Sequence, residues 1–72
     1  MPETPITISE MIREAKRELG LRQAFYPVRV RERRMNARQA DRQIDVQAAI
    51  VETLIQVRKE RGEDDAQGRF IE

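Results

Sequence analysis

The residues of this chain whose chemistry could serve a function are arginines, and they concentrate in one segment. The 72 residues include 14 basic and 13 acidic ones, so the net charge is only +1. Residues 22 to 42, however, hold seven arginines and two acidic residues, a net charge of +5. The segments 1 to 21 and 43 to 72 carry −1 and −3. Because an arginine guanidinium can fork onto phosphate or carboxylate oxygens, this segment is the candidate site for an anionic partner.

We call six of these arginines the basic tip: Arg29, Arg31, Arg33, Arg34, Arg38 and Arg42. We expect them to form the site together with the neighbouring Tyr26. Arg34, Arg38 and Arg42 are four residues apart, which places them on one face if a helix extends back to Arg34. Such a row could follow a phosphate backbone, while Tyr26 or Phe25 could stack on bases.

The alternative is that these charges only solvate one end of the molecule. Arg38 and Arg42 could then pair with Asp41 and Asp45 nearby in the sequence. A GC-rich genome would also supply arginine codons without any functional reason.

Other chemistry has little support in the sequence. The chain has no cysteine and no histidine, and zinc, haem and iron-sulfur sites need thiolate or imidazole ligands. Glu10, Glu14 and Glu18 recur every four residues beside Arg13 and Arg17, a pattern typical of a solvated helical face. We therefore expect no catalytic residue, metal, cofactor or small-molecule substrate, and we predict that the chain is not an enzyme.

Size and hydropathy limit the class of protein further. No apolar run approaches the roughly 18 to 20 residues of a membrane span, and the first residues lack the pattern of a signal peptide. We expect a cytoplasmic protein without membrane contact. A chain this short buries only about 60% of the surface that its unfolded form exposes. Without a disulfide, oligomerisation is the remaining source of buried area.

The first half of the chain predicts a helix from about residue 8 to residue 34. Thr7 and Glu10 have the spacing of a capping box, which marks the start. Pro27 removes one backbone donor and disfavours the α conformation at the residue before it. The sequence leaves open whether the helix bends there or ends near Phe25, with a short second helix following.

The second half predicts a helix from about residue 37 to residue 61. Asn36 is a favoured N-cap, and Gly62 supplies the stop. Two helices of similar length joined by a short turn predict an all-α, antiparallel helical hairpin with a kinked first arm, within one domain of residues 1 to 62. Residues 63 to 72 are acidic and predict a disordered tail, in which Phe70 and Ile71 either fray or form a short motif.

The apolar residues of the second helix spread over about 200° of its circumference, whereas one partner helix needs about 100°. Four of them are expected to face the first helix: Ile44, Ala48, Val51 and Ile55. The surplus predicts a second neighbour, either the bent part of the first helix or another copy of the chain. We expect the second copy, in a homodimeric four-helix bundle with coiled-coil-like packing through a second set: Val46, Ile50, Leu54 and Val57. Gln43 and Gln47 lie within the same arc, either at the dimer seam or at the edge of a monomeric core.

Part of the sequence resembles small uncharacterised proteins of tailed bacteriophages and prophages. The resemblance covers residues 18 to 50 and rests on Glu18-Leu19, Arg22, Tyr26-Pro27, Val30, Arg34-Met35-Asn36, Ala40-Asp41-Arg42-Gln43-Ile44 and Ala49-Ile50. The resembling pattern has an aromatic residue after Tyr-Pro and a glycine before Arg-Met, where this chain has Arg29 and Arg33. The resemblance implies a setting in the host bacterial cell, and it implies no particular mechanism.

The leading hypothesis is a non-enzymatic interaction module of a phage or prophage, acting on a protein or nucleic-acid partner through its apolar helix face and basic tip. The alternative is a nucleic-acid-binding accessory factor of phage DNA metabolism. The two differ in salt dependence, because binding to phosphates weakens steeply as salt rises.

Overall fold

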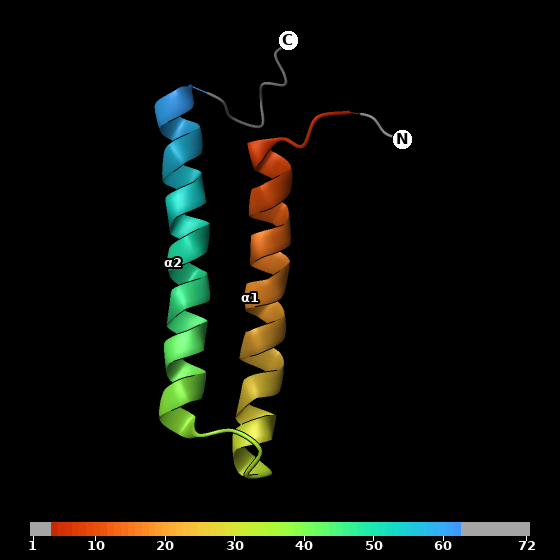
Figure 1. Cartoon of the computed structure of the whole chain (residues 1–72), viewed down its shortest axis with the longest axis vertical. Helices are drawn as coiled ribbons and strands as arrows, with labels where there is room; N and C mark the ends of the chain where they lie inside the picture. Colours follow the sequence, from red (N-terminus) through yellow and green to blue (C-terminus); the bar gives the residue numbers. More distant parts are fainter. Residues whose placement is uncertain (1–3, 63–72) are drawn as a thin grey trace.

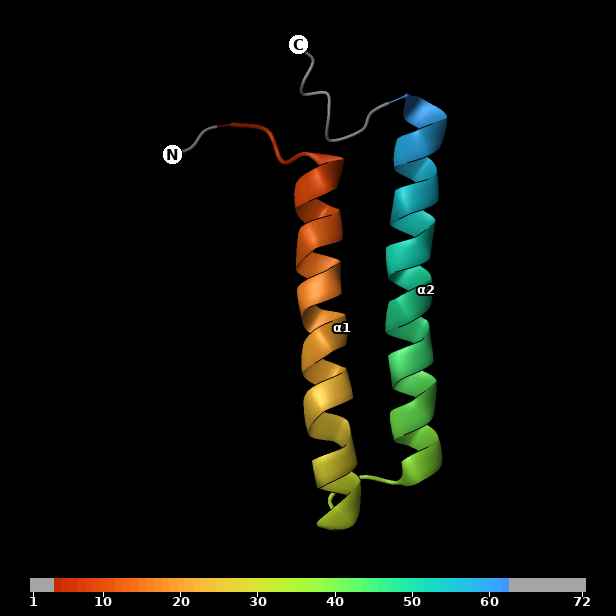
Figure 2. The same cartoon turned by 180° about the vertical axis from the view of Figure 1, so that it is seen from behind.

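The computed structural model describes residues 4 to 62, which form two helices, α1 (Ile8–Arg31) and α2 (Ala37–Arg61). The helices lie side by side and antiparallel, joined by a short connection (Figures 1 and 2). We call the end with this connection the turn end and the other the open end. Residues 4 to 62 contain no strand, so the predicted all-α hairpin is confirmed. The predicted tail of residues 63 to 72 lies outside the described residues.

Helix α1 begins where its capping residues place it. The Thr7 side chain accepts a hydrogen bond of 3.0 Å from the backbone N–H of Glu10, and the Thr7 N–H donates one of 3.1 Å to Glu10 Oε1. This capping box satisfies backbone donors that have no partner inside the helix. The predicted start at residue 8 is therefore confirmed.

Helix α1 continues through Pro27 as one element (Figure 1). Proline has no N–H, so the carbonyl of Gln23 loses the hydrogen bond that a helix normally supplies from four residues on. The alternative in which the helix ends near Phe25 is wrong, because α1 extends to Arg31.

The connection starts earlier than predicted, since α1 ends at Arg31 and not at residue 34. Arg33 has a φ of 60°, in the left-handed region. Its N–H donates to the Val30 carbonyl at 3.0 Å, and the Arg34 N–H donates to the Arg29 carbonyl at 2.8 Å. These two bonds form the Schellman motif that ends many helices. Glycine is favoured at its left-handed position, where this chain has Arg33.

Helix α2 begins and ends as predicted. The Asn36 side chain accepts hydrogen bonds from the N–H groups of Arg38 at 2.8 Å and Gln39 at 3.2 Å. Gly62, with a φ of 75°, caps the other end. Both signals are local in the sequence, which is why the range 37 to 61 could be predicted.

The two helices face each other along rows spaced alternately by four and three residues, the heptad spacing of coiled coils. We call these the inner rows. That of α1 is Ile8, Ile12, Ala15, Leu19, Arg22 and Tyr26, and that of α2 is Ala40, Ile44, Gln47, Val51, Leu54 and Arg58. The most buried members are Ile8, Ile12, Ala15, Ala40, Gln47 and Val51. No large side chain within residues 4 to 62 is fully buried, so the core is thin.

The face that α2 turns to α1 differs in part from the expected one. Val51 and Ile44 lie in the inner row as expected, Val51 buried and Ile44 half-buried, whereas Ala48 and Ile55 lie outside that row and are half-buried. Gln47 is buried in the core, where its side-chain amide donates a hydrogen bond to the Ala15 carbonyl of α1. The placement of Gln47 on a dimer seam is therefore wrong.

Candidate interaction surfaces

The structure gathers all six arginines of the basic tip at the turn end, and all six are exposed. They come from three elements: Arg29 and Arg31 from α1, Arg33 and Arg34 from the connection, and Arg38 and Arg42 from α2. The condition for a row of three arginines on one helix is not met, because α2 begins only after Asn36, and of the three only Arg38 and Arg42 lie on α2. Arg34 instead forms an ion pair of 3.4 Å with Glu32.

The structure also does not show the alternative in which Arg38 and Arg42 pair with neighbouring acids. Within the described residues, neither Arg38 nor Arg42 forms an ion pair with Asp41 or Asp45. The first turn of α2 holds no acidic residue. Because the start of a helix carries a partial positive charge, the helix dipole adds to the positive potential of the tip.

Tyr26 does not offer a free stacking surface. Its ring lies 5.6 Å from the guanidinium carbon of Arg29 and 6.0 Å from that of Arg22. Its hydroxyl donates a hydrogen bond of 3.2 Å to Gln43 Oε1, and Arg22 Nη1 donates one of 2.9 Å to the Gln43 carbonyl. Tyr26 thus helps to join α1 to α2. Its neighbour Phe25 is the exposed aromatic residue among residues 4 to 62, with 52% of its surface accessible.

A second surface lies on α2, along a row next to its inner row. We call Val46, Ile50, Thr53 and Val57 the α2 outer row. Val46 and Ile50 are each 43% exposed. They border an apolar hollow of about 330 Å³ that is also lined by Ala49, Thr53 and Leu54.

The residues predicted for a dimer interface lie at this surface in different ways. Val46, Ile50 and Val57 belong to the α2 outer row, whereas Leu54 lies in the inner row and reaches the hollow from its edge. Thr53 was missed, although its spacing of three from Ile50 and four from Val57 marks it as part of the row.

Helix α1 carries an outer row of its own, which the sequence reasoning also missed. It comprises Met11, Glu14, Glu18, Leu21 and Phe25, spaced by three and four. The apolar members are exposed, Leu21 at 38% and Phe25 at 52%. A hollow of about 250 Å³ lies beside these two residues, lined also by Glu18, Arg22, Tyr26 and Arg29.

The two outer rows turn to the same side of the hairpin. In both helices each outer-row residue directly precedes an inner-row residue, as Phe25 precedes Tyr26 and Ile50 precedes Val51. Each outer row is therefore rotated by about 100° from its inner row, in the same sense. In an antiparallel pair, equal rotations of the same sense bring both rows to one side. We call this side the apolar face.

The two acids on the apolar face have arginine partners one turn away. Glu18 Oε2 lies 3.0 Å from Arg22 Nε, and Glu14 Oε1 accepts a hydrogen bond of 3.2 Å from Arg17 Nε. The hydrogen bonds from Arg17, and then its charge, hold the pKa of Glu14 below its ordinary value. The acids interrupt the apolar row of α1, whereas the outer row of α2 carries no charge.

No family model, curated protein or solved structure matches the chain. Neither of the two described helices is long and apolar enough to cross a membrane. Residues 4 to 62 hold no cluster of three or more acidic side chains that could bind a metal ion. What the two surfaces bind is therefore inferred from their own geometry.

Proposed function

We propose that this protein is a non-enzymatic interaction module that binds helical protein surfaces through its apolar face. Its first partner is a second copy of the chain, with which it builds a four-helix bundle. The observation that carries the proposal is the shared orientation of the two outer rows. Together they expose Met11, Leu21 and Phe25 on α1 and Val46 and Ile50 on α2.

The thin core of the hairpin supports a second layer. The buried apolar residues among the described ones are Ile8, Ile12, Ala15, Ala40 and Val51, and two of these are alanines. Stable domains usually consist of at least two packed layers around a core. A second hairpin on the apolar face would turn both outer rows into core positions of a bundle. The resemblance to phage and prophage proteins suggests that the module acts inside a bacterial host.

The proposal is tested by the oligomeric state of the chain and of one variant. Sedimentation of the full chain over a concentration series should give about twice the chain mass at micromolar concentration. Ile50→Glu places a charge in the apolar hollow, so it should return the protein to a monomer and lower its melting temperature. Gln23→Glu makes the same charge change at an exposed α1 site off the face and should leave the mass unchanged.

A monomer at every concentration, with Ile50→Glu no less stable than Gln23→Glu, would contradict the proposal.

A second candidate function, nucleic-acid binding at the basic tip, is favoured by the charges of that end. Arg38 and Arg42 have no ion-pair partner among the described residues and lie in the first two turns of α2. Arginine side chains so placed can contact phosphates. The salt dependence of DNA binding tests this candidate.

A further inference from the structure

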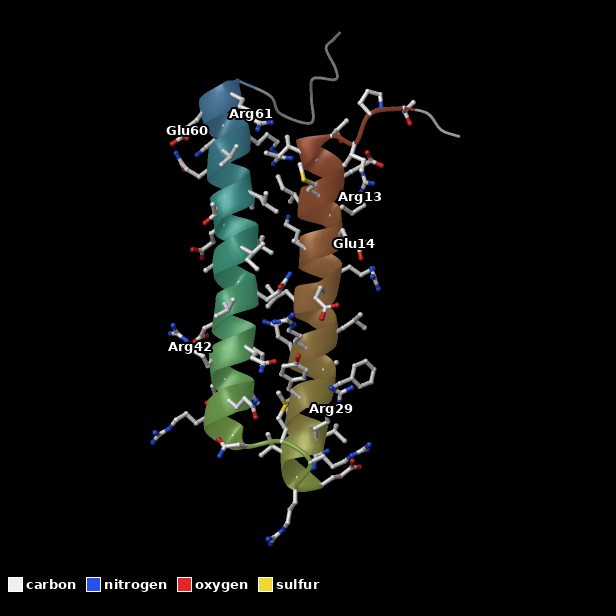
Figure 3. The ribbon with its side chains drawn as sticks, in the orientation of Figure 1. Arg13, Glu14, Arg29, Arg42, Glu60 and Arg61 are labelled. Atoms are coloured by element: carbon white, nitrogen blue, oxygen red, sulfur yellow. The ribbon has the colours of Figure 1, made fainter. Side chains whose placement is uncertain are left out.

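We infer that two copies of the chain pair antiparallel, α2 against α2, so that the turn end of each lies beside the open end of the other. This inference rests on the proposed function, because it specifies the orientation of the partner on the apolar face. The evidence for this orientation is the placement of two residues of opposite charge, Arg42 and Glu60. Figure 3 shows both side chains on the outer side of α2, pointing away from α1, near opposite ends of the helix.

The side chains of these two residues point to the same side of α2. Arg42 and Glu60 are 18 residues apart, which is about five full turns at about 3.6 residues per turn. They therefore point the same way and lie about 27 Å apart along the helix axis. Both are exposed. Glu60 accepts a hydrogen bond of 3.2 Å from Gln56, which leaves its second carboxylate oxygen open.

A twofold axis perpendicular to α2 near Val51 would exchange the two ends of the helix. It would place Arg42 beside the partner's Glu60, and Glu60 beside the partner's Arg42. One symmetric interface would thus contain two such ion pairs, flanking the α2 outer row. In antiparallel helix pairs, charges at flanking positions of this kind select the orientation.

The same axis makes the α2 outer row complementary to itself. Val46 would lie opposite the partner's Val57, and Ile50 opposite the partner's Thr53. The hollow of about 330 Å³ includes Ala49, whose small side chain leaves room for a branched side chain from the partner. No charged residue interrupts this row, in contrast to the outer row of α1.

The opposite orientation, with both turn ends together, is disfavoured by charge. It would place side by side two segments that each carry a net charge of +5 over residues 22 to 42. In the antiparallel orientation the basic tip meets the end at which α2 reaches Gly62. Glu60 is the acidic residue of that last turn, beside Arg58, Lys59 and Arg61, so the opposite charge at this end comes from Glu60 itself.

The orientation decides how the dimer presents its basic tips. They would lie at opposite ends, separated by about one helix length of 37 Å. Such a dimer would bridge two anionic partners, whereas the opposite orientation would present one large basic patch.

Disulfide formation between introduced cysteines tests the orientation, because the chain has no cysteine of its own. Arg42→Cys and Glu60→Cys are each made alone, in the full chain, and are oxidised separately and as a mixture. We expect a covalent dimer from the mixture and at most a trace from either variant alone. Glu52→Cys, at an exposed site about 80° further around α2 from the outer row than Arg42, is the matched control and should not cross-link with either.

Charge reversal gives an independent readout. Arg42→Glu should raise the dissociation constant of the dimer by about tenfold, since two attractive pairs become repulsive. Glu60→Arg should do the same, and a mixture of the two variants should form a heterodimer of near wild-type affinity.

The possible outcomes separate the two proposals. A dimer that Ile50→Glu abolishes, but that cross-links through Arg42→Cys alone or through no combination, overturns the antiparallel orientation and leaves the proposed function standing. A chain that remains monomeric, with Ile50→Glu without effect, overturns both.

Discussion

The side-chain amide of Gln47 donates a hydrogen bond of 3.0 Å to the carbonyl oxygen of Ala15, midway along the interface of the two helices. Gln47 is 6% exposed and Ala15 is 8% exposed. A polar side chain is tolerated in a core when its hydrogen-bonding groups have partners. Because the amide reaches one carbonyl of α1, it also sets the register of α2 along α1.

Replacing Gln47 separates the packing contribution of this side chain from its hydrogen bond. Gln47→Ala should lower the free energy of unfolding by about 1 to 3 kcal/mol, because it leaves a cavity in a thin core. Gln47→Leu keeps the volume, and the Ala15 carbonyl retains its bond within α1, so the change should stay within about 1 kcal/mol. Urea unfolding at one fixed protein concentration measures both. Equal losses in the two variants would show that the hydrogen bond, and not the packing, dominates.

Arg33 is a site for stabilisation at the turn. Its left-handed φ of 60° costs a side chain roughly 1 kcal/mol more than it costs glycine. Arg33→Gly should therefore raise the free energy of unfolding by about 0.5 to 1 kcal/mol, seen as a higher melting temperature. Arg34→Gly removes the same charge one residue later, at a residue without a positive φ, and should not stabilise. Equal effects of the two variants would mean that charge repulsion at the basic tip is the cause.

The salt dependence of DNA binding tests the basic tip as a nucleic-acid site. Each phosphate contact should make the slope of log affinity against log salt steeper by about 0.7 to 0.9. Replacing Arg38 and Arg42 by glutamine should thus make it shallower by nearly two units. Replacing Arg13 and Arg17 by glutamine makes the same charge change near the open end and should leave the slope unchanged. No binding of single- or double-stranded DNA at about 50 mM salt would remove this candidate.

The ion pair of Glu14 predicts a pH effect with a defined sign. Hydrogen bonds from Arg17 lower the pKa of Glu14 in the folded protein. The resulting stabilisation is present above the pKa of the unfolded chain, and it is lost as the pH falls through the lower, folded-state pKa. Arg17→Gln should raise the pKa of Glu14 towards its ordinary value, which NMR titration of the carboxyl carbon can follow. An unchanged pKa would show that the pair does not persist in solution.

The sequence by itself determined the features of this fold that depend on neighbours along the chain. Thr7 with Glu10, Asn36 and Gly62 each act within about one turn of a helix end, through hydrogen bonds to the nearby backbone. Their residue types therefore predicted the start of α1 and both ends of α2. The concentration of arginines between them likewise placed a basic tip at the turn.

Only the tertiary structure decided the features that depend on how α1 meets α2. The burial of Gln47 follows from the rotation and register of α2 against α1, and the periodicity of α2 alone allowed several rotations of its wide apolar arc. The left-handed conformation of Arg33 was hidden because arginine, unlike glycine, does not mark such a position. The alignment of both outer rows on one apolar face, and the common direction of Arg42 and Glu60 away from α1, appear only once two helices are packed antiparallel.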